Sequence, residues 1–213
     1  MENLQLLHDA ILRGDLSTSV AQTEVAIAAG IDPQEIINKY MSPAMEEIGR
    51  RFEEGTAFVP ELLLAARAMK GSLELLKPLM AAGANIQLGR VVIGTVKGDL
   101  HDIGKNLVAS MLEGCGFEVI NLGVDISSEK FIEAIRANNA DILCMSALLT
   151  TTMNYMKEVI DALNSSGIRN AVKVMIGGAP VSSSFAEQIG ADGYSDNANA
   201  AVNLAKSLVA TPV

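Results

Sequence analysis

The stretch Arg90-Val-Val-Ile-Gly-Thr-Val96-Lys-Gly-Asp-Leu-His-Asp-Ile-Gly-Lys-Asn106 sets the fold of most of the chain. It opens on a short apolar run, which is typical of a parallel strand buried on both of its faces. A loop with two glycines follows, and from about 103 to 114 the apolar residues take a helical spacing. The stretch therefore predicts one strand–loop–helix unit of an α/β sheet.

The same alternation continues toward the end of the sequence. Apolar runs of strand length alternate with helical patterns, giving strands at 117–121, 140–145, 172–176 and 192–195 and helices at 127–137, 153–164, 183–189 and 197–208. Alternating strands and helices form parallel sheets with helices on both faces. Together with the first unit, they predict a Rossmann/flavodoxin-like, doubly wound parallel sheet of five strands.

The residues before this region predict an α-helical bundle that forms a cap domain. Asp32-Pro33-Gln34-Glu35 has the composition of a helix start, with Asp32 as N-cap and Pro33 in the first helical position. Ser42-Pro43 restarts the helix, and another begins near Pro60, so we expect four short helices. Little charge and many small residues mark 80–89 as a linker. We therefore expect a helical cap domain at 1–88 and the α/β domain at 89–213.

Composition narrows the class of protein. The net charge of −9 and the pI of about 4.7 argue against a nucleic-acid partner, because phosphates attract Lys and Arg. No apolar run reaches the ~18 residues of a membrane span. The two cysteines form no Cys-x-x-Cys pair, and the opening residues are too polar for a signal peptide. We therefore expect a cytoplasmic protein that associates with neither nucleic acid nor membrane.

The loop after the first strand holds the candidate site, because ligands of such sheets bind at the carboxyl ends of the strands. His101 could ligate a metal through one ring nitrogen. Asp99 could accept the other ring N–H and so orient the ring. Gly98 and Gly104 would let the backbone turn and approach a bulky ligand. The alternative is that this short Asp/His/Gly cluster is only a turn followed by a helix N-cap.

A metal at His101 would need ligands that the chain does not supply. The only other histidine is His8, in a distant helical segment, and the chain has no cysteine cluster. A bare metal site takes about four protein ligands. If His101 binds a metal, a macrocycle with four nitrogens and one free axial position would supply the remainder. These residues alone do not identify the metal.

Three short motifs give the chain a family resemblance. Asp99-x-His101-x-x-Gly104 resembles the Asp-x-His-x-x-Gly motif of the cobalamin-binding fold, Ser146-Ala-Leu148 resembles its Ser-x-Leu, and Gly177-Gly178 its Gly-Gly. The stretch from Met45 to Glu61, with Gly49, Phe52, Gly55 and Pro60, resembles the helical cap before this domain in methionine synthase. The small corrinoid proteins of methylamine, methanol and methoxyaryl methyltransferase systems share this plan.

The resemblance implies a cofactor and a site. The cofactor would be cobalamin or a related corrinoid, as methylcobalamin or Co(I) corrinoid, with His101 as the lower cobalt ligand. Asp99 and Thr152 would complete a catalytic relay with His101; Thr152 stands where the synthase has a serine. Phe58 would lie over the upper face. The residues implied to bind the cofactor are Gly98, Asp99, His101, Asp102, Ile103, Gly104, Ser146, Leu148, Thr150, Gly177, Gly178, Ala179 and Phe58.

The resemblance also implies a function. The chain would be the corrinoid subunit of a multi-component methyltransferase, with no catalysis of its own. It would carry a methyl group from a substrate-specific methyltransferase to a second one acting on tetrahydrofolate or a thiol, with a reductive activase as a further partner. One alternative is the cobalamin subunit of a radical mutase, but such subunits lack a cap domain like residues 1–80. A second is a B12 sensor or regulator, which would need a basic helix-turn-helix that this acidic chain does not show.

A third class of protein with this sheet order is the response regulator. It would need an acidic pair at the end of the first strand.

Overall fold

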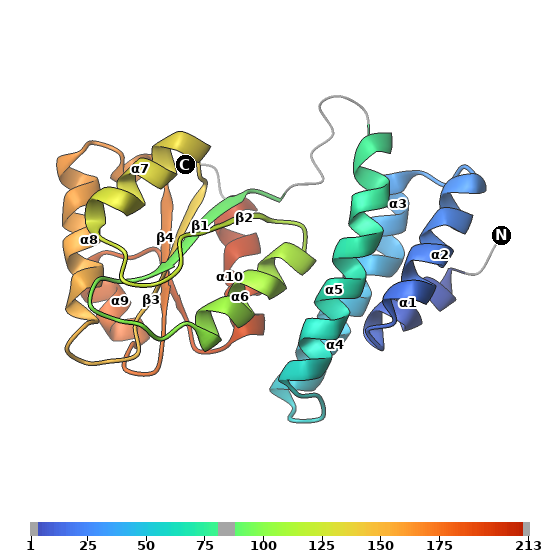
Figure 1. Ribbon diagram of the computed structural model, residues 1–213, viewed down its shortest axis with the longest axis horizontal. Coiled ribbons are helices and arrows are strands. Elements are labelled where there is room, and N and C mark those ends of the chain that lie inside the picture. Colours follow the sequence, from blue (N-terminus) through green and yellow to red (C-terminus); the bar gives the residue numbers. More distant parts are fainter. Residues whose placement is uncertain (1–3, 81–87, 211–213) are drawn as a thin grey trace. The chain divides into compact units, whose positions relative to one another are not determined.

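The computed structural model of the protein describes residues 4–80 and 88–210. The chain divides into two compact units, Met1–Gln87 with Ser110–Gly116 and Leu88–Ala109 with Phe117–Val213 (Figure 1). Most of the predicted linker, residues 81–87, lies outside the described residues, and the domain boundary after residue 88 stays a prediction. Within the described residues, no helix is both long and apolar enough to cross a membrane.

The first unit contains the predicted helices. Its elements are α1 (Gln5–Leu12), α2 (Leu16–Ala28), α3 (Pro33–Ile36), the π-helix η1 (Ile37–Met41), α4 (Ser42–Glu53), α5 (Val59–Leu76) and the 3₁₀ helix η2 (Lys77–Leu79). Residues 33–53 are helical throughout, as α3, η1 and α4, and η2 directly follows α5, so the unit contains the helical bundle that the sequence predicts.

The predicted helix start at Asp32 is confirmed. Its carboxylate Oδ1 accepts the backbone N–H groups of Gln34 at 2.9 Å and Glu35 at 3.1 Å, and Pro33 occupies the first turn. The predicted restart at Ser42-Pro43 is also confirmed, because α4 begins there after one π-helical turn. A cap that satisfies free N–H groups and a proline in the first turn both favour a helix start.

The second unit is the predicted doubly wound sheet. Five parallel strands lie in the order β2-β1-β3-β4-β5. Their bounds are β1 (Arg90–Thr95), β2 (Glu118–Asn121), β3 (Ile142–Ser146), β4 (Lys173–Gly177) and β5 (Gly193–Ser195). The helices are α6 (Ile103–Gly114), α7 (Ser128–Asn138), α8 (Asn154–Ser165), the 3₁₀ turn η3 (Arg169–Ala171), α9 (Ser183–Ile189) and α10 (Ala198–Ala210). Helices α7, α8 and α9 cover one face of the sheet and α6 and α10 the other (Figure 1).

The strand order places the candidate site. From β1 the chain crosses to β2 on one side, and from β2 it returns to β3 on the other side of β1. The loops that follow β1 and β3 therefore lie side by side at the switch point, where doubly wound sheets bind ligands. Thr95 pairs with Ser146 at the ends of these strands, and the N–H of Val96 donates to the carbonyl of Ser146 at 3.0 Å.

Gly178 lets two strand ends approach closely. Its φ is +126°, and a Cβ at this position would overlap the carbonyl oxygen of Ala147, which follows β3. The backbone after β3 already occupies the space that a side chain at this position would need, so packing by itself requires a glycine here. The predicted contact of Gly178 with a cofactor stays a prediction.

We expect Gly178→Ala to destabilise the second unit by about 3 kcal/mol or more, because backbone strain and overpacking add. Gly190→Ala is the matched control: Gly190 also has a positive φ, +78°, but a Cβ there would meet no atom within 4 Å. It should cost only about 1–2 kcal/mol. Urea denaturation followed by circular dichroism measures both, and hydrogen exchange of β3 and β4 amides assigns the loss to this unit. Equal losses would contradict the packing role of Gly178.

Candidate functional site

The site is organised around the buried carboxylate of Asp99, which accepts five hydrogen bonds. Its Oδ1 accepts the backbone N–H of His101 at 3.0 Å and the ring Nδ1 of His101 at 2.7 Å. Its Oδ2 accepts the backbone N–H groups of Leu148 at 2.8 Å and Leu149 at 3.3 Å, and the hydroxyl of Thr152 at 2.7 Å. Asp99 therefore joins the loop after β1 to the loop after β3.

These bonds fix the charge of Asp99. Burial would by itself raise the pKa of the carboxyl, but the hydrogen bonds from Leu148, Thr152 and His101 together lower it well below its usual value. The carboxylate is therefore ionised and can only accept, so the hydrogen between it and the ring belongs to Nδ1 of His101. The lone pair of Nε2 is therefore available to a metal. The His101 side chain is 50% exposed, so a ligand can reach it.

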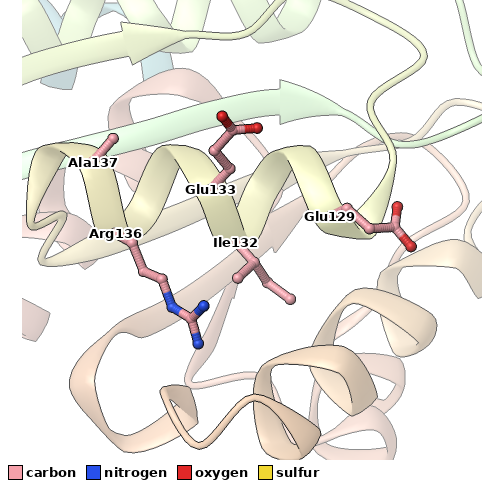
Figure 2. A pocket seen from close by; sticks show the side chains of 5 residues that line it. All are labelled: Glu129, Ile132, Glu133, Arg136 and Ala137. Atoms are coloured by element: carbon pink, nitrogen blue, oxygen red, sulfur yellow. The ribbon is translucent and has the colours of Figure 1, made fainter.

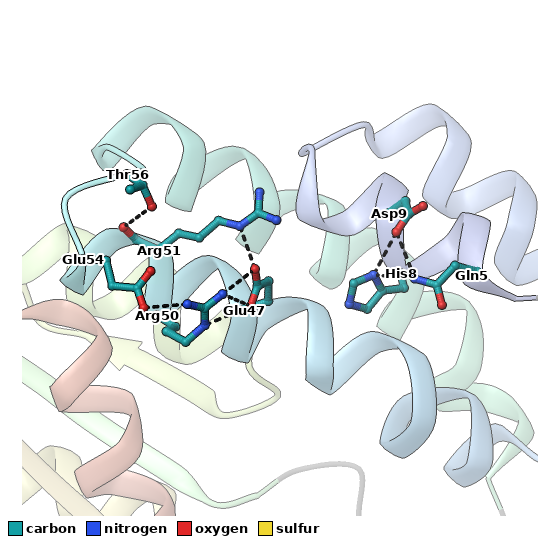
Figure 3. Close-up of polar contacts among 8 residues, drawn as sticks. All are labelled: Gln5, His8, Asp9, Glu47, Arg50, Arg51, Glu54 and Thr56. Atoms are coloured by element: carbon teal, nitrogen blue, oxygen red, sulfur yellow. Dashed lines mark hydrogen bonds and ion pairs between the residues drawn. The ribbon is translucent and has the colours of Figure 1, made fainter.

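The other histidine, His8, has a different environment (Figure 3). Its Nδ1 lies 3.0 Å from Asp9, but Asp9 is 41% exposed and also accepts the amide of Gln5 at 3.0 Å. All three residues lie on α1. Both histidines thus have an aspartate partner, and only that of His101 is buried and bonded to a second loop.

A tight turn directs Asp99 inward. The N–H of Asp99 donates to the carbonyl of Val96 at 3.2 Å, and Gly98, the third residue of this turn, has φ +79°. Because the second residue of the turn, Lys97, has no positive φ, the positive φ at the third position identifies a type II turn, in which glycine is favoured there. The hydroxyl of Thr95 then donates to the carbonyl of His101 at 2.9 Å and holds the next part of the loop.

The residues after His101 form the first turn of α6. Asp102 accepts the side-chain amide of Asn106 at 2.9 Å, and Ile103 is 87% exposed. Gly104 is helical, has no positive φ and has open space around its Cβ position. The expectation that Gly104 turns the backbone is therefore wrong, and its predicted close approach to a ligand stays a prediction. Gly98 does take the left-handed conformation expected of it.

Exposed apolar side chains flank the histidine in sequence. Leu100 is 72% exposed and precedes His101, and Ile103 follows it. Leu148 and Leu149, whose N–H groups bind Asp99, are 43% and 42% exposed. Exposed apolar clusters on an otherwise polar surface mark binding sites for apolar groups. A ligand bound by His101 would thus meet an apolar surface.

The remaining predicted residues take different positions. Ser146 and Gly177 are the last residues of β3 and β4 and pair with each other, and Gly178 follows directly. Thr150 and Ala179 are exposed in the loops after these strands. Phe58 belongs to the first unit, where it is 65% exposed and its N–H donates to Glu61 at 2.8 Å before α5. Its predicted place over a cofactor stays a prediction.

Sequence reasoning missed several residues around the site, among them Leu149 and Lys105. Leu149 acts through its backbone N–H, which no side-chain motif reports. Lys105 is buried, at 3% exposed, and its Nζ donates to the side-chain oxygens of Asn106 at 2.5 Å and Asn121 at 2.8 Å. Burial lowers the pKa of Lys105, and the nearby charge of Asp102 acts in the opposite direction. A lysine in the first turn of a helix is normally solvated, so its burial depends on β2 and is visible only in the fold.

A hollow of about 560 Å³ lies elsewhere, on the outer side of α7 (Figure 2). Its lining residues are Glu129, Ile132, Glu133, Arg136 and Ala137, and none of the predicted site residues is among them. Within residues 4–80 and 88–210, no group of three or more His, Cys, Asp or Glu side chains could hold a metal ion.

Comparison with known proteins gives consistent matches over the whole length. The family described as "B12 binding domain" matches residues 89–203, and a second family of the same description matches residues 4–77. The dimethylamine corrinoid protein of Methanosarcina barkeri is 46% identical over 210 residues, 98% of each chain. Trimethylamine corrinoid protein 2 of Methanosarcina acetivorans is 43% identical over 94% of each chain.

Two solved structures are similar over nearly all of the chain. A cobalamin-binding protein from Desulfitobacterium hafniense has a TM-score of 0.82 at 32% identity, covering 98% of this chain and 99% of that one. A chain of the methanol:cobalamin methyltransferase complex MtaBC from Methanosarcina barkeri has a TM-score of 0.83 at 31% identity, covering 100% of this chain and 82% of that one.

The Asp99 site should make stability depend on acid pH. Because its pKa is lowered on folding, Asp99 adds stability above the unfolded value of about 3.9, and that stability is lost as pH falls below it. Thr152→Val removes one donor, so it should cost about 1.5–3 kcal/mol at pH 7. The unfolded pKa is common to both proteins, so the loss should shrink only when pH falls through the folded-state pKa of the Val variant, which lies between that of the wild type and the unfolded value; Thr152→Ser should follow the wild type. Urea denaturation across pH 2–7 measures this; a constant Val penalty would contradict it.

Proposed function

Because this chain belongs to the methyltransferase-type corrinoid proteins with B12-binding domains, we propose that it binds its corrinoid through His101 and passes a methyl group between two methyltransferases. Corrinoid binding and a carrier role in methyl transfer follow from the family. The site residues and the second partner are our proposal. The observation that carries the site is the Nδ1–Asp99 bond, which leaves Nε2 of an exposed ring free.

The residues of the second unit fit a corrinoid in two respects. A corrin ring would supply most of the ligands of its metal, so the protein would need to add only one, and His101 offers one ring nitrogen of fixed tautomer. A corrin also presents a broad face. The exposed side chains of Leu100, Ile103, Leu148 and Leu149 offer apolar surface on the two loops that carry His101 and the donors to Asp99.

Bound cobalt supplies a centre that can take up and release a methyl group. In this proposal His101 is the lower ligand, Asp99 keeps Nδ1 protonated and the ring oriented, and Thr152 holds Asp99. The other residues proposed to contact the cofactor are Gly98, Asp102, Ile103, Gly104, Ser146, Leu148, Thr150, Gly177, Gly178, Ala179 and Phe58.

The relatives suggest the methyl donor. Matches named for dimethylamine and trimethylamine are 42–46% identical to this chain, whereas the match from the methanol system is 31% identical. We therefore place the chain in a methylamine system, where it receives its methyl group from a substrate-specific methyltransferase. A second methyltransferase, acting on a thiol or on tetrahydrofolate, and a reductive activase complete the proposed set. The cytoplasmic location and the domain boundary at 88/89 stay predictions.

We expect His101→Ala to change the visible spectrum of the bound corrinoid, because an axial nitrogen is lost. In the Co(II) state, the nitrogen superhyperfine splitting of the EPR signal should disappear as well. His8→Ala is the matched control, since it removes the other histidine and its exposed aspartate contact. It should leave both spectra unchanged. If His101→Ala keeps the wild-type spectra at every pH, His101 is not the ligand.

The methyl donor is tested by reconstitution. Holo-protein is mixed in turn with methyltransferases for dimethylamine, trimethylamine and methanol, each with its substrate, and methylation of the corrinoid is followed in the visible spectrum. We expect methylation with a methylamine enzyme at a rate at least about tenfold above that with the methanol enzyme, a difference of 1.4 kcal/mol in activation free energy. Preference for methanol would overturn the assignment of the donor and leave the carrier role intact.

A further inference from the structure

Asp125, in the loop between β2 and α7, makes two hydrogen bonds to the turn that carries Asp99. Its carboxylate Oδ1 accepts the N–H of Gly98 at 2.8 Å. Its own N–H donates to the carbonyl of Asp99 at 3.1 Å. Asp125 itself is exposed, so these bonds are its contacts with the site and not a consequence of core packing.

The backbone of Asp125 is in the left-handed region, with φ +55°. In the described part of the chain, Asn139, at φ +46°, is the other non-glycine residue with a positive φ. Asn139 ends α7, where left-handed residues commonly cap helices. Asp125 ends no helix or strand, and its hydrogen bonds to Gly98 and Asp99 help to hold it in this uncommon conformation.

The bond from Gly98 selects the type of turn. Type I and type II turns differ in the orientation of their central peptide, which here joins Lys97 and Gly98; between the two types this peptide is rotated by about 180°. Glycine can adopt either form. The carboxylate of Asp125 accepts the Gly98 N–H in the orientation that is observed, and a flipped peptide would direct that N–H away from it. Asp125 therefore stabilises the type II form.

The segment around Asp125 is anchored to β1. The N–H of Thr95 donates to the carbonyl of Gly123 at 3.0 Å, and the N–H of Ile126 donates to the carbonyl of Thr95 at 3.0 Å. Ile126 is 5% exposed and forms a parallel bridge with Val96. Because the residues on both sides of Asp125 are fixed to the sheet, its carboxylate is a fixed support for the turn.

We propose that Asp125 is a positioning residue for metal ligation: it holds the Val96–Asp99 turn in its type II form, and so directs Asp99 and His101 toward the cofactor. The inference rests on the proposed function of His101. The inference adds to the site a residue that would contact neither the corrin ring nor the metal. Asp125 acts through the peptide N–H of Gly98 and the carbonyl of Asp99.

The first test uses the protein without cofactor. Asp125→Gly keeps the left-handed backbone and its N–H but removes the carboxylate, whereas Asp125→Asn keeps an acceptor oxygen and tolerates the same φ. NMR hydrogen exchange of the Gly98 amide should be at least about tenfold faster in Asp125→Gly, the typical effect of losing a charged acceptor. It should be close to the wild type in Asp125→Asn and in the control Asn139→Gly.

The second test uses the holo-protein in the Co(II) state, read by EPR for axial nitrogen coordination. We expect Asp125→Gly to bind corrinoid with a reduced fraction of nitrogen-coordinated cobalt, and Asp125→Asn and Asn139→Gly to match the wild type. Wild-type coordination in Asp125→Gly would overturn the inference, whether or not Gly98 exchange accelerates. His101→Ala separates the two hypotheses: if it matches the wild type, the proposed ligand fails, and if it alone loses coordination, only the role of Asp125 fails.

Discussion

The buried charge of Asp99 is the constraint on which the site depends. An ionised carboxylate removed from water is costly unless donors replace its hydration. Here the donors come from two loops: the N–H groups of Leu148 and Leu149 and the hydroxyl of Thr152 follow β3, and His101 follows β1. A charge that needs both loops can be buried only where the two strands are neighbours. The strand order β2-β1-β3 therefore serves the site directly, and the orientation of the histidine ring follows from the requirements of the carboxylate.

The same requirement explains the unusual backbone around the site. Asp99 can point inward only because Gly98 turns the chain with a positive φ, and Asp125 holds that turn from the next loop. After β4, Gly178 allows the backbone beyond β3 to pass close by, which fixes the loop that supplies the donors. The left-handed residues and close contacts of this edge are thus parts of one arrangement, in which local strain is offset by hydrogen bonds to a buried anion.

The sequence predicts much of this structure where the signal is local. The range of α6, the N-cap at Asp32 and the alternation of strands and helices depend on periodicity and on turn residues, and the structure agrees. The pair Asp99–His101 was also predictable, because two residues of separation allow the contact. Leu149 and Asp125 were not, since one acts through its backbone and the other through a partner 27 positions away. Gly104 shows the opposite error, because a glycine beside a motif suggested a turn where the helix had already begun.

The hydrogen bonds at Asp99 also bear on how the site would respond when His101 is not bound to metal. The carboxylate accepts three of its five hydrogen bonds from the loop after β3, namely from the N–H groups of Leu148 and Leu149 and from the hydroxyl of Thr152. Burial alone would raise its pKa, but these donors and those of His101 hold it well below the usual value, so the carboxylate stays ionised and keeps accepting. None of these bonds involves Nε2 of His101, so release of a metal from Nε2 would break none of them. The two loops would therefore keep their arrangement whether or not the histidine is coordinated.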